Sequence, residues 1–401
     1  MLGDVSLPLG FSFGSRSFSR NVALVLALGA AARARGMPRL RGFLTTPLLL
    51  LAAAAAVSVA ANAGAWGDTR NLAFMALLYW GARSLAETRS GRDWLFHWLG
   101  ALTVTTVALE VIENPSILQF REALRGTTVT GHPNTLGVLF ALLGPLFLAH
   151  LGRRRGAALY AGCAILGAGF TFSRLAWSGL ALGAIAVAVL ERPQRPHRTL
   201  VGAGLLAAGV TAAVIAWLST TRAEADWQRL RIMWTSLTLF RDHWLLGVGF
   251  GTSNLARVFP ARYIELYGSG LFLFHSHNMY VDLLVGAGAL GGIAGAWLMT
   301  RLVALAARGL RATRGAPAGR RAAAGLAATV LVFLFVGLGD TPWYHARVLF
   351  PLAILWALVD GSVAAAERAA AGSGSQAPAS PASKGVAKAV AICFMMSPIV
   401  A

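Results

Sequence analysis

Residues 275–292 read HSHNMYVDLLVGAGALGG, so two histidines and an asparagine stand directly before a long apolar run. The imidazole of His277 can accept or donate a proton near neutral pH, which suits a general base. Asn278 has the side chain of a helix N-cap. The stretch therefore allows two interpretations: a helix that begins with polar capping residues, or a reactive group held at the start of that helix. In both cases we predict that His275 is a bystander.

An isolated arginine, Arg174, lies in FTFSRLAWSG between two apolar runs that almost no loop separates. Such an arginine can extend its charged end to the water–lipid boundary and do nothing more. It can also bind an anion, because its planar guanidinium stays charged and donates hydrogen bonds to phosphate oxygens in pairs. Arg229 and Arg231 add charge in a later segment, where they could equally form the solvated face of a helix. A diphosphate is an anion that would suit all three.

Polar groups also precede another apolar run, in GTTVTGHPNTLG at residues 126–137. His132 and Asn134 could contact a substrate there, or Pro133 and the glycines could simply shape a turn. No HxxxH pair, CxxC motif or cluster of carboxylates accompanies the histidines of the chain. We therefore predict no metal centre and no cofactor.

The composition is that of a membrane protein. Of the 401 residues 56% are hydrophobic and only 13% are charged, whereas soluble domains carry about 25% charged residues. Apolar runs of ~20 residues recur, which is the length that crosses a hydrocarbon core of ~30 Å. The net charge of +19 does not indicate a nucleic-acid partner, because the arginines form short clusters between the apolar runs.

The hydropathy pattern predicts an all-α fold: a polytopic transmembrane helical bundle of about 11–12 spans with one large external, partly helical loop. The predicted spans are residues 21–34, 43–63, 70–84, 94–112, 135–152, 156–172, 175–191, 199–218, 279–306, 322–338 and 345–364. The chain then divides into an N-terminal transmembrane bundle (1–218), the large external loop (219–278), the C-terminal transmembrane helices (279–366) and a tail predicted to be disordered and cytoplasmic (367–401).

The basic residues predict the orientation of the spans. Arginine clusters recur in alternate loops, and cytoplasmic loops are those that carry an excess of arginine and lysine. The other loops are then external, and they contain the three residues with the clearest chemistry, Arg174, Arg231 and His277. We therefore predict a multi-pass membrane protein whose candidate site faces the outside.

Two helices are predicted inside the external loop. In the first, apolar residues at spacings of 3, 4 and 3 predict one face of an amphipathic helix: Leu230, Met233, Leu237 and Phe240. GVGFG then ends this helix, and residues 252–267 predict a second, proline-interrupted helix with Thr252 or Ser253 as its N-cap. The run GAGALGG in the next span predicts close helix packing rather than a nucleotide loop.

Four segments together resemble a known family, and they occur in its order. They are GHPNTLG before a span, FSRLAW at an external turn, RIMWTSLTLFRDHWLLGVGFG in the large external loop, and HSHNMYVDLLVGAGALGG at the entry to the next span. Over roughly residues 110–360 the chain resembles the superfamily of O-antigen ligases and polysaccharide polymerases, which are bacterial membrane glycosyltransferases.

The resemblance implies a metal-independent transferase of polysaccharide biosynthesis in the bacterial cytoplasmic (inner) membrane, with its active site facing the periplasm. It would take an undecaprenyl-diphosphate-linked glycan and pass the glycan to a free hydroxyl of a glycan or lipid acceptor, as in lipopolysaccharide assembly. Carried over by motif, Arg174 and Arg231 bind the diphosphate of the donor, and His277 activates or positions the acceptor hydroxyl. The further substrate-binding residues that we predict are Asn278, Arg229, His132 and Asn134.

Two sets of alternatives stay open. A polysaccharide polymerase and a protein O-oligosaccharyltransferase of the same superfamily share the donor and differ in the acceptor. A transporter or flippase of lipid-linked intermediates is the rival from another class. Transporters place charged residues near the middle of the bilayer, whereas the one clear acidic candidate within a predicted span, Glu110, lies near an external end. The sequence therefore favours an enzyme over a transporter.

Overall fold

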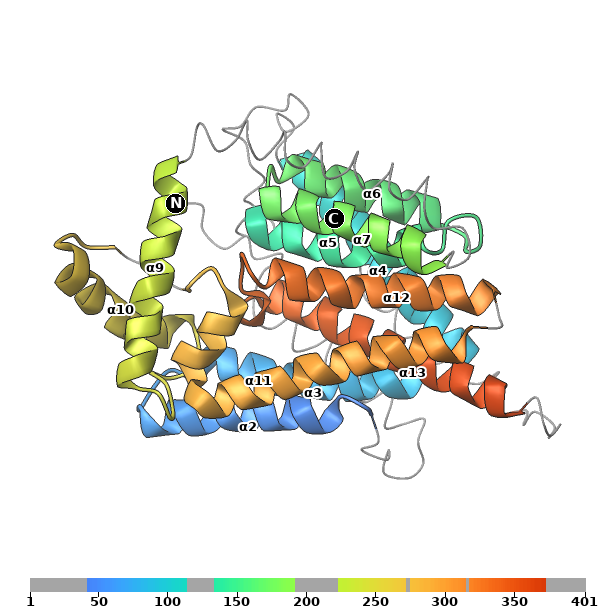
Figure 1. Cartoon of the computed structure of the whole chain (residues 1–401). Helices are drawn as coiled ribbons and strands as arrows, with labels where there is room; N and C mark the ends of the chain where they lie inside the picture. Colours follow the sequence, from blue (N-terminus) through green and yellow to red (C-terminus); the bar gives the residue numbers. More distant parts are fainter. Residues whose placement is uncertain (1–41, 114–132, 192–222, 272–274, 315–316, 373–401) are drawn as a thin grey trace, which may run out of the picture.

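The computed structural model of the chain describes residues 42–113, 133–191, 223–271, 275–314 and 317–372 (Figure 1). Every regular element among these residues is a helix. Within the described ranges, five helices are long and apolar enough to cross a membrane: α4 (Arg89–Glu113), α7 (Arg174–Glu191), α11 (Met279–Ala312), α12 (Pro317–Val336) and α13 (Ala346–Gly372). Three shorter apolar helices accompany them: α2 (Thr45–Ala61), α5 (Pro133–Leu148) and α6 (Ala157–Phe170). The predicted all-α, polytopic membrane fold is confirmed.

The remaining helices are α3 (Gly67–Leu85), α9 (Ala223–Asp242), α10 (Thr252–Tyr267) and the short 3-10 helix η3 (Pro342–Tyr344). Each predicted span that falls within the described residues coincides with a helix. The predicted spans 21–34 and 199–218 lie outside the described residues, as does most of the predicted tail. The total number of spans and the division into four regions therefore stay predictions.

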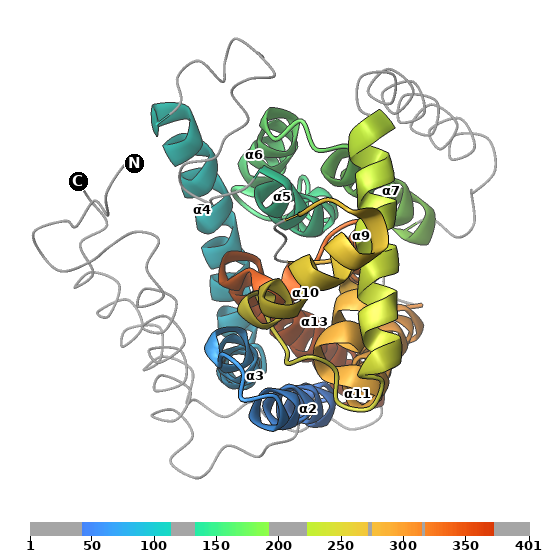
Figure 2. The ribbon, with the colours of Figure 1, turned by 90° about the vertical axis from the view of Figure 1, so that its left-hand side faces the viewer.

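Helix α13 lies in the core of the bundle. It packs against α3, α4, α11 and α12, and residues 348–361 are buried without a gap. Trp343, Trp356 and Phe333 meet edge to face in this core, an arrangement that aromatic rings prefer. Helices α5, α6 and α7 form a second group, which packs against α12 and α4 of the first (Figure 1, Figure 2).

Helix α11 is broken near its beginning. Gly288 has a left-handed backbone (φ 63°) that interrupts the helical geometry. The N–H of Ala289 would bond to Val285 O in a regular helix, but it donates to Trp244 O at 2.7 Å instead. Val285 O accepts the N–H of Val248 at 2.9 Å. The glycine-rich run, which we predicted to be a packing seam, is thus also where the GVGFG segment lies against α11.

Helix α9 does not bury the face that the sequence predicts. Its buried residues are Ile232, Thr235, Ser236 and Leu239, whereas Leu230 of the predicted face is 51% exposed. The prediction is wrong for Leu230, whereas Phe240 of the predicted face does pack against the buried cluster. Apolar side chains surround this helix, so hydrophobicity alone does not select the packed face. Thr235 and Ser236 on the packed face are small, and the Thr235 hydroxyl donates to Arg231 O at 2.8 Å.

The predicted N-cap of α10 is also wrong. Gly251 occupies the cap position and makes no side-chain bond. Instead, the carboxylate of Asp68 in α3 accepts the Thr252 N–H at 2.8 Å and the Thr252 hydroxyl at 2.9 Å. A residue distant in sequence therefore supplies the acceptor that a local cap would give. The helix also continues through Pro260, although we predicted an interruption there.

Candidate active site

The N-terminus of α11 carries the predicted His-Asn pair. Asn278 is the N-cap, as predicted: its side-chain oxygen accepts the N–H groups of Tyr280 at 3.0 Å and Val281 at 3.2 Å. Its side-chain amide also donates to Leu338 O at 3.2 Å, in the loop between α12 and α13. Asn278 therefore fixes the backbone beside His277 and joins the start of α11 to that loop. Its predicted contact with substrate stays a prediction.

A buried carboxylate, Asp282, reinforces the same junction. Asp282 is fully buried in the first turn of α11. Its carboxylate accepts the Ser276 N–H at 2.8 Å and the hydroxyl of Thr341. Ser276 and Thr341 belong to the two loops that meet at this end of the bundle, so one side chain holds both loops. Sequence reasoning missed Asp282, although an acidic residue inside an apolar span is itself a signal of function or structure.

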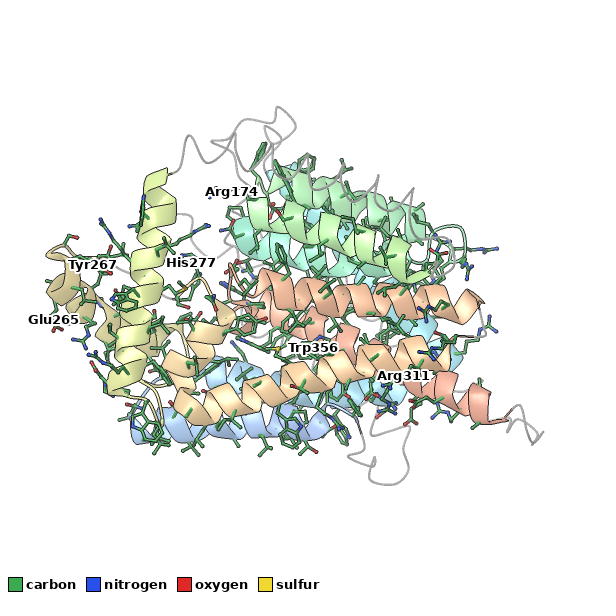
Figure 3. All side chains as sticks on the ribbon, in the orientation of Figure 1. Arg174, Glu265, Tyr267, His277, Arg311 and Trp356 are labelled. Carbon is green, nitrogen blue, oxygen red and sulfur yellow. The ribbon has the colours of Figure 1, made fainter. Side chains whose placement is uncertain are left out.

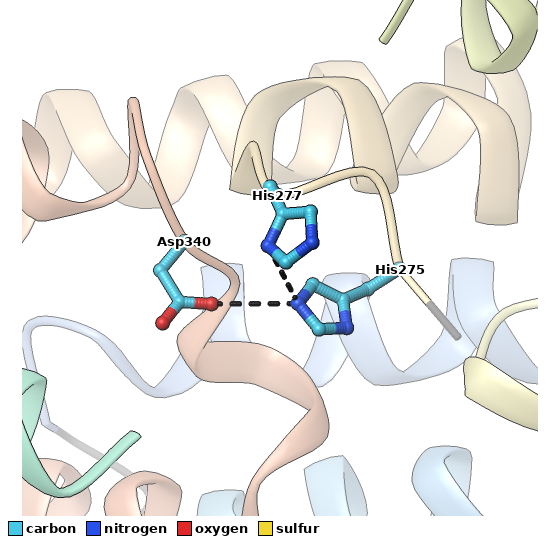
Figure 4. Close-up of side chains that lie close together, drawn as sticks. All are labelled: His275, His277 and Asp340. Carbon is cyan, nitrogen blue, oxygen red and sulfur yellow. Dashed lines mark hydrogen bonds and ion pairs between the residues drawn. The ribbon is translucent and has the colours of Figure 1, made fainter. Parts of the chain in front are cut away.

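His277 adopts a strained backbone between these two anchors. Its φ of 57° lies in the left-handed region, which non-glycine residues rarely occupy. The non-glycine residues that do adopt this conformation cluster at functional sites. Its Nδ1 lies 3.1 Å from Nε2 of His275, and the same Nε2 lies 3.6 Å from Oδ1 of Asp340 (Figure 4). The geometry thus brings His275, which we predicted to be a bystander, into contact with His277. Asp340 was not singled out in the sequence.

Arg174 is the first residue of α7, and it lies near this cluster. Its neighbour Leu175 lies against Gly339, the residue before Asp340. A Cβ atom added to Gly339 would be only 3.1 Å from the Leu175 side chain. Figure 3 places Arg174 and His277 at the same end of the bundle and Arg311 at the other. The predicted grouping of Arg174 with His277 is therefore compatible with the fold.

The two polar segments before α5 and α7 lie together. Gly137 of GHPNTLG packs against Thr171 and Ser173 of the turn that precedes Arg174. Asn134, at the start of α5, is half-buried at this end. His132 lies outside the described residues. The roles of His132 and Asn134 in substrate binding stay predictions.

The other two predicted arginines come from α9. Arg231 is exposed, and its guanidinium lies 5.5 Å from the centre of the Tyr267 ring in α10. Arg229 is exposed on the same helix. Both arginines belong to a helix that packs on α11 and α10 and that is not one of the candidate membrane spans. The described contacts link Arg231 to α10 rather than to His277.

A comparison with family models now adds to this geometry. Residues 158–296 match the model described as O-antigen ligase. Over this region, the chain is similar to the O-antigen ligase family. The matched region runs from α6 into α11 and includes Arg174, Arg231 and His277. Members of this superfamily are glycosyltransferase-like enzymes that act on lipid-linked glycans. A comparison with curated proteins found no match.

The cluster of His275, His277 and Asp340 could also hold a metal ion. The ligand atoms of His275, His277 and Asp340 all lie within 4.8 Å of one another. Two imidazoles and a carboxylate form a donor set that zinc accepts, with an open position for a substrate. The sequence showed no such set because Asp340 is distant from the histidines along the chain. Metal independence therefore stays a prediction that needs its own measurement.

We expect Asp282→Ala to destabilise the protein strongly. The substitution leaves the buried Ser276 N–H and the Thr341 hydroxyl without their acceptor, at a cost of about 1–3 kcal/mol for each. Asp282→Asn keeps one acceptor oxygen and should lose less. The matched control is Glu265→Ala. It removes a carboxylate that is 64% exposed, from a surface ion pair that contributes little to the free energy of unfolding. Melting of the purified protein in nanodiscs measures the effect; equal melting temperatures for Asp282→Ala and Glu265→Ala would contradict it.

Proposed function

We propose that this protein transfers a glycan from an undecaprenyl-diphosphate-linked donor to an acceptor hydroxyl at the outer face of the cytoplasmic membrane. The observation that carries the proposal is the position of Arg174 and His277 at one end of the bundle, with His275 in contact with His277. Arg174 begins α7 and the two histidines directly precede α11, all inside the region that matches the O-antigen ligase family. A phosphate-binding cation and a proton acceptor at a membrane surface are what this transfer needs.

The arginines would act on the leaving group. The diphosphate gains negative charge as its bond to the anomeric carbon breaks, so fixed guanidinium donors stabilise the transition state more than the bound donor. Arg174 would meet the diphosphate from the spanning bundle and Arg231 from α9. Two helices that pack separately around the lipid would hold it from two sides.

His277 would act on the acceptor. The imidazole of His277, whose Nδ1 lies 3.1 Å from Nε2 of His275, would take the hydroxyl proton. The acceptor oxygen then attacks the anomeric carbon, the bond to the diphosphate breaks, and direct displacement inverts the configuration at that carbon. His275 is placed between His277 and the carboxylate of Asp340, so it would act as a positioning residue that fixes the ring and spreads the positive charge.

The acceptor and the reaction class are separated by the products of one assay. We expect the purified protein to transfer glycan from an undecaprenyl-diphosphate oligosaccharide to a lipid-linked sugar, a second repeat unit or a serine-containing peptide. These three acceptors stand for ligase, polymerase and protein O-oligosaccharyltransferase. The metal-independent mechanism predicts full activity in chelator. Donor movement across a vesicle membrane without product would instead indicate a flippase.

In that assay, we expect Arg174→Ala and Arg231→Ala each to lower the rate by about 100-fold or more, and His277→Ala by ~10²–10⁴-fold. Arg241→Ala is the matched control for Arg231→Ala, because Arg241 lies on the same helix with its side chain 77% exposed. Full activity in all three site variants would overturn the site. Release of undecaprenyl diphosphate without glycan transfer would indicate hydrolysis.

His275→Gln tests the positioning role. We expect a fall in kcat that is smaller than the loss in His277→Ala, an unchanged KM for the donor, and a shifted pH dependence of kcat, because the ring that contacts His277 is gone. His243→Gln, in an exposed histidine at the end of α9, is the control. If His275 has only a structural role, His275→Gln will lower the melting temperature but leave the pH dependence of the remaining activity unchanged.

A further inference from the structure

Helix α9 presents an apolar stripe on the side opposite its packed face. Trp227, Leu230 and Trp234 are between 51% and 62% exposed, and their spacings of 3 and 4 place them on one side of the helix. The helix runs crosswise to α11, α12 and α13 at the end of the bundle that holds His277 (Figure 1), along one side of the bundle (Figure 2). The stripe is therefore not part of the described packing.

Exposed apolar side chains connect this end of the bundle with the side of a candidate membrane span. Trp244 and Leu245, just after α9, are 59% and 47% exposed. Their backbone lies against the break in α11, where Trp244 O accepts the Ala289 N–H. Directly beyond this point, α11 exposes Ile293 and Trp297, within a helix long and apolar enough to cross a membrane. The exposed residues after α9 therefore lie next to the exposed side of a candidate membrane span.

The chemistry of the stripe fits the boundary of a membrane rather than its interior. Tryptophan is enriched at that boundary, because its large ring is apolar and its N–H is polar. Arg231 and Arg241 are exposed on the same helix, and arginine complements the phosphates of lipid headgroups. An apolar stripe flanked by arginines on a helix that lies across the spans is typical of an interfacial amphipathic helix.

We propose that α9 lies in the boundary between headgroups and acyl chains of the membrane leaflet at the His277 end, with Trp227, Leu230 and Trp234 in contact with phospholipid. The surrounding lipid is the partner of this face. One consequence rests on the proposed function: the membrane would hold Arg231 at the depth of lipid phosphates, where the diphosphate of a lipid-linked donor also lies.

Nitroxide labels at single cysteines test the proposal. Cys163 and Cys393 are replaced by alanine, Trp234→Cys is labelled, and the protein is placed in phospholipid nanodiscs. We expect the label at 234 to collide with oxygen and to be shielded from a water-soluble nickel chelate. Glu265→Cys on α10, 64% exposed, is the water-facing control, and Ile293→Cys on α11 is the lipid-facing control. Leu230→Cys repeats the measurement one turn away.

Equal nickel accessibility at 234, 230 and 265 would overturn the proposal. Short-range coupling between two labels at 234 would also overturn it, since a second copy of the chain would then cover the stripe. The measurement needs no activity. A lipid-facing label in a protein without transferase activity would therefore leave this proposal standing and count against the proposed function only.

Discussion

The buried carboxylate of Asp282 holds two non-helical segments at one end of a helical membrane bundle. Buried polar groups in such segments need partners, because water does not reach them. Asp282 accepts the Ser276 N–H and the Thr341 hydroxyl, and the cap at Asn278 satisfies the first N–H groups of α11. With both loops fixed, His277 keeps a left-handed backbone, and His275 meets Asp340. The proposed chemistry depends on that fixed geometry.

The break in α11 extends the same constraint to the external segment. Gly288 releases backbone groups from the helix, and the chain that follows α9 takes them up through Trp244 and Val248. Ser58 of α2 adds a hydrogen bond to Gly286 O at 2.7 Å. The chain that follows the Arg231 helix is therefore joined by backbone hydrogen bonds to the helix that begins just after His277. In the proposed function, this connection fixes the position of the Arg231 helix relative to His277, so that both residues can act on the same lipid-linked donor.

Much of the fold follows from local sequence. Apolar runs predicted the helices, and the polar start of α11 predicted the cap at Asn278, because both signals lie within a few residues of the structure they specify. The packed face of α9, the cap of Thr252 by Asp68, and the contact of His275 with Asp340 could not be predicted in this way. Each depends on a partner from another helix, and the sequence alone gives no register between distant helices.

The position of the diphosphate tests the proposed function most directly. A cryo-electron microscopy structure of the protein in nanodiscs with undecaprenyl diphosphate would locate both phosphorus atoms. We expect the diphosphate between the guanidinium groups of Arg174 and Arg231, with Nε2 of His277 facing the side on which an acceptor hydroxyl would approach. A diphosphate bound near Arg311, at the opposite end of the bundle, would contradict the proposed site.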